Sequence, residues 1–135
     1  MKRMNRMNTD ADLVGETAVT RAVIGAAITV SNTLGCGFLE KVYENALTIE
    51  LTARGFAVEQ QRQMEVRYRE EIVGQYTADL VVNSSVVVEL KAVRCLEPVH
   101  RAQCMNYLRA SGISTGLVLN FGAPRLAFQR VQTFH

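Results

Sequence analysis

The hydrophobic period of the chain changes at Gly55 from about 3.6 to about 2 residues, and this change does most to restrict the possible folds. Before Gly55, apolar residues recur every three or four positions, which is the spacing of one helix face. The clearest examples are Val19, Val23, Ala27, Val30 and Leu34. After Gly55, apolar and polar residues alternate, as in Met64, Val66 and Tyr68, which is the spacing of a half-buried strand. The chain is therefore expected to begin with helices and to continue into a sheet.

Turn and cap residues divide the chain into eight expected elements. Thr9 or Asp10 can cap a first helix that ends at residues 35–37. The other expected elements are a helix at 38–54, strands at 58–68, 72–82 and 86–93, a helix at 98–110, and strands at 115–121 and 126–133. This order predicts one α/β domain over residues 10–135 with a mixed sheet, preceded by a flexible leader at residues 1–9.

The composition excludes several classes of protein. Of 135 residues, 48% are hydrophobic and 21% are charged, which excludes a disordered tail, a collagen-like repeat and a coiled-coil rod. The formal net charge is only +2, so binding to nucleic acid would need a local basic patch. Cys36, Cys95 and Cys104 form no C-x-x-C pair, which favours reduced thiols in the cytoplasm and makes zinc unexpected. No apolar run approaches the roughly 18 residues of a membrane span, so no membrane partner is expected.

Two acidic residues on neighbouring strands form the most informative pattern. If residues 83–85 make a three-residue turn, the strand register places Asp79 directly opposite Glu89. Lys91 follows Glu89 by two residues and so points to the same face. Two carboxylates at that distance need a cation between them, or one of them must hold a proton. Hard oxygen ligands of this kind suit Mg²⁺ or Mn²⁺.

A structural interpretation of the same residues stays open. Lys91 could neutralise Asp79 or Glu89 in an ion-pair cluster at the end of the sheet. The register also depends on the length of the turn, because a two-residue turn would place the two carboxylates on opposite faces.

The second expected helix contributes further acidic residues. Glu40 falls at the edge of the apolar arc of this helix, between Leu47 and Leu51, and could be a third carboxylate of a metal site. Tyr43 stands one turn along from Glu40. Glu50 falls near the middle of the arc, where we expect a buried structural ion pair.

The third expected helix presents polar residues on one face. His100, Gln103 and Tyr107 share this face through their spacing of three and four residues. The Gln103 amide could orient a water or a phosphate, or it could cap the edge of the sheet. A histidine such as His100 is more often a surface residue than a general base.

Taken together, these segments resemble a known family. Residues Gly37 to Tyr43 match the G-x-x-E-x-x-Y signature of the GxxExxY proteins, which are placed in the PD-(D/E)XK nuclease-like superfamily. The match continues through further segments over nearly the whole chain from about Val14: Ala46-Leu47, Glu50-Leu51, the Asp79 strand, Val88 to Val93, His100 to Gln103, Asn106 to Leu108, and Gly116 to Gly122.

The resemblance implies a restriction-endonuclease-like αβββαβ core, here with an extra N-terminal helix and C-terminal strand, and a bound Mg²⁺ or Mn²⁺. By this resemblance Asp79 matches the first acid of the motif, Glu89 and Lys91 match its E-x-K, and Glu40 matches the helical acid. Gln103 matches the glutamine of the exonuclease-like branch. Ala78 departs from the usual proline, a position that shapes the turn and not the chemistry.

The implied activity is metal-dependent hydrolysis of phosphodiester bonds in DNA or RNA. Asp79, Glu89, Glu40 and the main-chain carbonyl near Leu90 would hold the metal, and Lys91 would act on the attacking water or the phosphorane. Residues expected to contact the nucleic acid are Tyr43, His100, Arg101 and Tyr107. Further basic side chains are scattered along the sequence: Arg62, Arg67, Arg69, Arg94 and Arg109.

Two alternatives keep the fold without the catalysis. One is a nucleic-acid-binding or regulatory module with an intact-looking site. The other is an interaction protein that builds a homo-oligomer through its first helix and exposed strand edges. Binding of Mg²⁺ or Mn²⁺ at the Asp79–Glu89 pair would distinguish a nuclease from either alternative.

Overall fold

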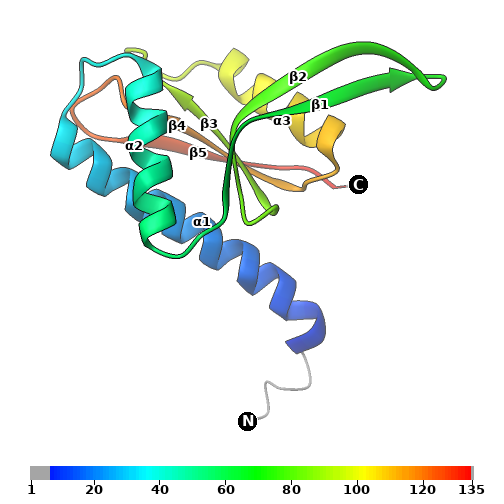
Figure 1. Ribbon diagram of the computed structural model, residues 1–135, viewed down its shortest axis with the longest axis horizontal. Coiled ribbons are helices and arrows are strands. Elements are labelled where there is room, and N and C mark those ends of the chain that lie inside the picture. Colours follow the sequence, from blue (N-terminus) through cyan, green and yellow to red (C-terminus); the bar gives the residue numbers. More distant parts are fainter. Residues whose placement is uncertain (1–6, 135) are drawn as a thin grey trace.

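The computed structural model describes residues 7–134, with side chains described from residue 18 onward. Eight elements follow one another in the expected order (Figure 1). They are α1 (Met7–Leu34), α2 (Glu40–Ala53), β1 (Val58–Tyr68), β2 (Glu71–Val82), β3 (Val86–Lys91), α3 (Pro98–Ser111), β4 (Thr115–Asn120) and β5 (Ala127–Gln132). No helix in this described part of the chain is long and apolar enough to cross a membrane.

Most boundaries differ by one or two residues from those expected, and helix α2, for example, begins at Glu40 and not at residue 38. Helix α1 begins at Met7, before the expected caps Thr9 and Asp10, and residues 1–6 of the expected leader lie outside the described residues. Strand β3 ends at Lys91 and not at residue 93. There the Asn120 side chain accepts the Val93 N–H at 3.0 Å and donates to the Val93 carbonyl at 2.9 Å. These side-chain bonds satisfy the Val93 backbone, so the chain can leave the strand ladder.

The five strands form one mixed sheet in the order β1-β2-β3-β4-β5. Only β3 and β4 are parallel, because α3 connects them as a crossover. Val82 pairs with Val86, which confirms the three-residue turn at 83–85. Asn83 and Ser84 in this turn have positive φ values of 51° and 53°.

Helices cover both faces of the sheet. Helices α1 and α2 pack on one face and α3 packs on the other (Figure 1). Strand β3 is buried on both sides, since Val86, Val88 and Leu90 belong to the core under α1 and α2, whereas Val87 belongs to the core under α3. Burial on both sides explains why this strand is apolar and β-branched.

The alternation of faces along β2 breaks at Asp79. Leu80 and Val82 lie in the core under α1 and α2, and Val81 lies in the core under α3, as alternation requires. Ala78 also lies under α3, although it differs from Val81 by an odd number of positions. Strand β2 therefore changes the face that it presents to α3 at Asp79.

Strands β1 and β2 continue beyond β3 as a two-stranded arm (Figure 1). The ladder between β2 and β3 covers only residues 80–82 and 86–88, whereas β1 and β2 pair over their full length. The outer part of the arm is exposed, including Tyr68 at 66% and Val73 at 61%.

Candidate active site

The candidate site lies where β2 and β3 separate, and Asp79 and Glu89 face each other there. The Asp79 N–H donates to Glu89 Oε2 at 3.2 Å, and the Leu90 N–H donates to Asp79 Oδ2 at 2.8 Å. Each carboxylate thus accepts a backbone N–H from the opposite strand, and the backbone ladder stops one residue earlier at Leu80 and Val88. The structure brings the two acids together, as the three-residue turn predicts.

The pair is poorly solvated, and this disfavours the ionised form of both acids. Burial, followed by the charge of Asp79, raises the pKa of Glu89 from 4.5 to about 8. Burial also raises the pKa of Asp79, an effect that the Leu90 N–H bond opposes and the charge of Glu44 reinforces. The charge of Glu40 on α2 makes a smaller contribution that raises the pKa of both acids. Within residues 18–134, however, Glu40 does not converge with Asp79 and Glu89 into a three-carboxylate cluster.

Lys91 lies close enough for its charge to lower the pKa of Glu89. Among the ion pairs of the described residues, however, none involves Lys91. This part of the chain therefore contains no ion-pair cluster in which Lys91 neutralises Asp79 or Glu89, and the ammonium group is not held in a structural contact with either acid.

Helix α2 buries a different acid from the one that the helical arc indicated. Glu44 is only 4% exposed, whereas Glu50 is half-buried and pairs with Arg54 at 2.8 Å. The ion pair expected of Glu50 is present, but it is not buried. Glu40 is exposed because it is the first residue of α2.

Sequence reasoning missed Glu44, although a signal for it exists. Glu44 follows Glu40 by four residues and precedes Leu47 by three, so it shares the stripe of Leu47 and Leu51. The expected arc was too broad, because it took in every apolar residue of the helix, including Ile49, which is 70% exposed. A narrower stripe would have placed Glu44 in the interior.

Gln61 on β1 connects Glu44 to the acid pair. Its side-chain Nε2 donates to Glu44 Oε1 at 2.9 Å and to Asp79 Oδ1 at 3.3 Å. Nothing in the sequence pattern singled out this residue, because an alternating strand gives no sign of which glutamine faces an acid. The candidate site thus draws side chains from α2, β1, β2 and β3.

Two tyrosines expected to contact substrate are buried instead. Tyr43 is fully buried, donates to the Gly35 carbonyl at 2.6 Å and accepts the Phe38 N–H at 3.2 Å. Tyr107 is 2% exposed and donates to the Arg62 carbonyl at 3.2 Å. Tyr43 therefore stabilises the loop that precedes Glu40. Tyr107 connects α3 to β1 through a hydrogen bond. Both hydroxyls are thus engaged with backbone carbonyls in the interior.

Of the other expected residues of α3, Arg101 and Gln103 are exposed and His100 is partly buried. His100 Nδ1 accepts the Glu97 N–H at 3.0 Å within a capping box, so His100 helps to begin the helix. Arg101 is exposed and donates to the Arg130 carbonyl at 3.4 Å. Gln103 is exposed, and no hydrogen bond of its side chain occurs within the described part of the chain.

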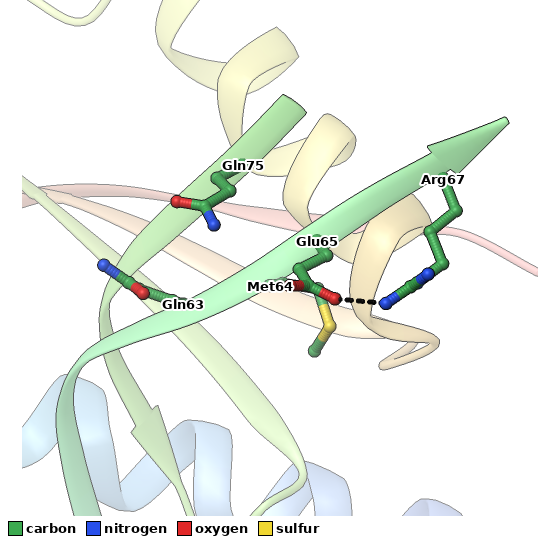
Figure 2. A pocket seen from close by; sticks show the side chains of 5 residues that line it. All are labelled: Gln63, Met64, Glu65, Arg67 and Gln75. Atoms are coloured by element: carbon green, nitrogen blue, oxygen red, sulfur yellow. Dashed lines mark hydrogen bonds and ion pairs between the residues drawn. The ribbon is translucent and has the colours of Figure 1, made fainter. Parts of the chain in front are cut away.

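A separate hollow of about 420 Å³ lies on the arm, lined by Gln63, Met64, Glu65, Arg67 and Gln75 (Figure 2). None of the expected site residues lines it. Figure 2 shows Arg67 paired with Glu65, at 2.7 Å. Arg62 is paired with Glu59 at 3.5 Å, so these two arginines of the arm are partly neutralised and do not extend a basic patch.

The donor set of the site fits a hard divalent cation held mainly by two carboxylates. Within residues 18–134, no three His, Cys, Asp or Glu side chains converge to form a complete cage. Mg²⁺ is commonly bound through one or two carboxylates and keeps several waters, and the pair of Asp79 and Glu89 matches this donor set. The raised pKa values of both acids describe a site whose negative charge a cation would relieve.

Comparison with known proteins agrees with this geometry. A family model described as the PD-(D/E)XK nuclease superfamily matches residues 17–131. A search of curated proteins found no significant match. A solved structure described as "Crystal structure of SSO0001" is similar in fold, with a TM-score of 0.56 and 18% sequence identity. The similarity covers 69% of this chain and 50% of that one, so the chain spans about half the length of that structure. Because the family model covers most of the sequence, including both acidic strands, the chain belongs to the PD-(D/E)XK nuclease superfamily.

Proposed function

We propose that the protein is a metal-dependent nuclease of the GxxExxY type that hydrolyses phosphodiester bonds in DNA or RNA. The observation that carries this proposal is the arrangement of Asp79 and Glu89 where β2 and β3 separate. Each carboxylate is bound to the backbone of the opposite strand, with Lys91 beside them and outside any ion pair of the described residues.

The acids of the site would hold the cation. Asp79 and Glu89 would bind Mg²⁺ or Mn²⁺ together with the main-chain carbonyl of Leu90. Glu40, exposed at the start of α2, would bind a second cation or a water of the first. When bound, the cation supplies charge neutralisation at the phosphoryl group and lowers the pKa of water.

The remaining polar residues would act on the water and the nucleic acid. Lys91 would orient or deprotonate the attacking water, or stabilise the negative charge that develops on the phosphorane. Gln103 would orient the substrate phosphate from the exposed surface of α3, with Arg101 contacting the same strand. Tyr43, Tyr107 and His100 would act indirectly, since their polar atoms already bind the backbone.

The test combines Mn²⁺ titration with cleavage assays on single-stranded and duplex DNA and RNA. We expect the parent protein to bind Mn²⁺ and to cleave at least one of these substrates only when Mg²⁺ or Mn²⁺ is present. Asp79→Asn should abolish cleavage, whereas Glu65→Gln on the arm, which also removes one carboxylate, should not. A parent protein that binds nucleic acid but neither binds Mn²⁺ nor cleaves would instead support the non-catalytic module.

A further inference from the structure

The side-chain amide of Gln61 joins two acids that come from different elements. Its Nε2 donates one hydrogen bond to Glu44 of α2 and one to Asp79 of β2. A primary amide nitrogen has two hydrogens, so both are used by carboxylate oxygens. The amide is therefore held with its nitrogen toward the acids and its oxygen away from them.

The backbone of β1 is distorted at this residue. Gln61 has a φ of 53°, in the left-handed region that non-glycine residues rarely occupy. The β1–β2 ladder pairs Gln60 with Leu80 and Arg62 with Ala78, and it omits Gln61 and Asp79 between them. Glycine would adopt this φ without strain. The strain of a glutamine at this position persists only where other contacts offset it, and the Gln61 side chain makes two hydrogen bonds.

Glu44 provides a fixed anchor for the amide. Both of its oxygens accept from Lys41 Nζ at 3.1 Å, and Gln60 Nε2 donates to Oε2 at 2.8 Å. Together with the bond from Gln61, these donors satisfy a carboxylate that is 4% exposed. Glu44 is thus fixed by these hydrogen bonds and is not available as a ligand for a cation.

The Asp79 carboxylate consequently accepts a hydrogen bond at each of its two oxygens. The Leu90 N–H holds Oδ2 at 2.8 Å, and the Gln61 amide holds Oδ1 at 3.3 Å. A ligand whose orientation is fixed before the cation arrives loses less freedom on binding it, which is the role of groups that hydrogen-bond to metal ligands.

We propose that Gln61 is a positioning residue that orients the Asp79 carboxylate for cation binding, with Glu44 as its anchor. The proposal rests on the metal-dependent function proposed above. Neighbouring Gln60 provides a matched control, because it also donates to Glu44 but otherwise to Asn45 Oδ1 at 2.9 Å, and not to Asp79.

The first experiment measures Mn²⁺ affinity by calorimetry in three variants. Gln61→Ala and Gln61→Gly should each weaken Mn²⁺ binding about 10- to 100-fold, the range seen when partners of metal ligands are removed. Gln60→Ala should change the Mn²⁺ affinity by less than about threefold, which is below the range expected for partners of metal ligands. Gln61→Gly also relieves the left-handed backbone, so it should melt at a higher temperature than Gln61→Ala while binding Mn²⁺ equally weakly. Loss of affinity without loss of stability distinguishes positioning from a structural role.

The second experiment needs no metal. In the ¹⁵N–¹H spectrum, the side-chain amide of Gln61 should shift in both Asp79→Asn and Glu44→Gln, whereas that of Gln60 should shift only in Glu44→Gln. If the chemical shift of the Gln61 amide does not change in Asp79→Asn, the proposal is overturned. Equal Mn²⁺ affinities in Gln61→Gly and Gln60→Ala would also overturn it. A parent protein that binds no Mn²⁺ would refute the proposed function itself, and the positioning role with it.

Discussion

Replacement of Glu89 by glutamine tests whether this acid is a strained metal ligand or a structural counter-ion. The substitution keeps the volume of the side chain and an oxygen that can accept the Asp79 N–H. It removes the ionisable group, and with it the free energy that folding loses by disfavouring the ionised form of Glu89. We expect Glu89→Gln to stabilise the metal-free protein at neutral pH and to abolish metal-dependent cleavage.

The magnitude follows from the pKa of Glu89. A raised pKa means that the folded state holds the proton more tightly than the unfolded chain. The parent protein should therefore keep its full stability below about pH 4.5 and lose stability as the pH rises toward about 8. A shift from 4.5 to about 8 limits the loss of unfolding free energy to a maximum on the order of 5 kcal/mol at high pH. Roughly 3 kcal/mol of this loss applies at pH 7. Because Glu89 retains some solvent contact, we expect a gain of about 1–3 kcal/mol at pH 7.

Urea unfolding of the parent and the variant between pH 4 and pH 9, in chelator, measures this difference. The difference should be small at pH 4 and should grow with pH. Glu70→Gln, which removes an exposed charge at the tip of the arm, should follow the parent throughout. Adding Mn²⁺ should raise the melting temperature of the parent but not that of Glu89→Gln. A variant that is less stable than the parent at pH 7 would refute the reasoning and show that the ionised Glu89 stabilises the fold.

Three further substitutions separate the roles of other residues. Lys91→Ala should keep or improve Mn²⁺ affinity in calorimetry and lower the cleavage rate by roughly two orders of magnitude, because it removes the proposed catalytic cation and no ion pair of the described residues. A strongly destabilised variant would restore the ion-pair interpretation. Tyr43→Phe removes two hydrogen bonds to the loop before α2 and should lower the free energy of unfolding by about 1–2 kcal/mol; unchanged stability in urea would contradict this. Gly122→Ala would place a Cβ against the backbone of Val93 and should cost about 3 kcal/mol or more, measured in the same way; a mild effect would show that this loop can move aside.

Local sequence information was sufficient for the order of the elements and for the central acid pair. The change of period at Gly55 and the turn residues depend on near neighbours in the chain, and they predicted the helices and strands within a few residues. The acid pair was also predictable, because a three-residue turn fixes the register of the two strands that it connects. Asp79 and Glu89 are ten residues apart, and everything that brings them together lies between them.

The supporting shell of the site was decided only by tertiary packing. Glu44 is buried and Ile49 is exposed because α2 meets the sheet and α1 along a narrow stripe, which hydrophobicity alone does not reveal. The link from Glu44 through Gln61 to Asp79 spans separations of 17 and 18 residues and depends on a left-handed residue inside a strand. No local preference predicts such a conformation, because non-glycine residues disfavour it. It persists only where contacts from other elements hold it, so only the folded structure could show it.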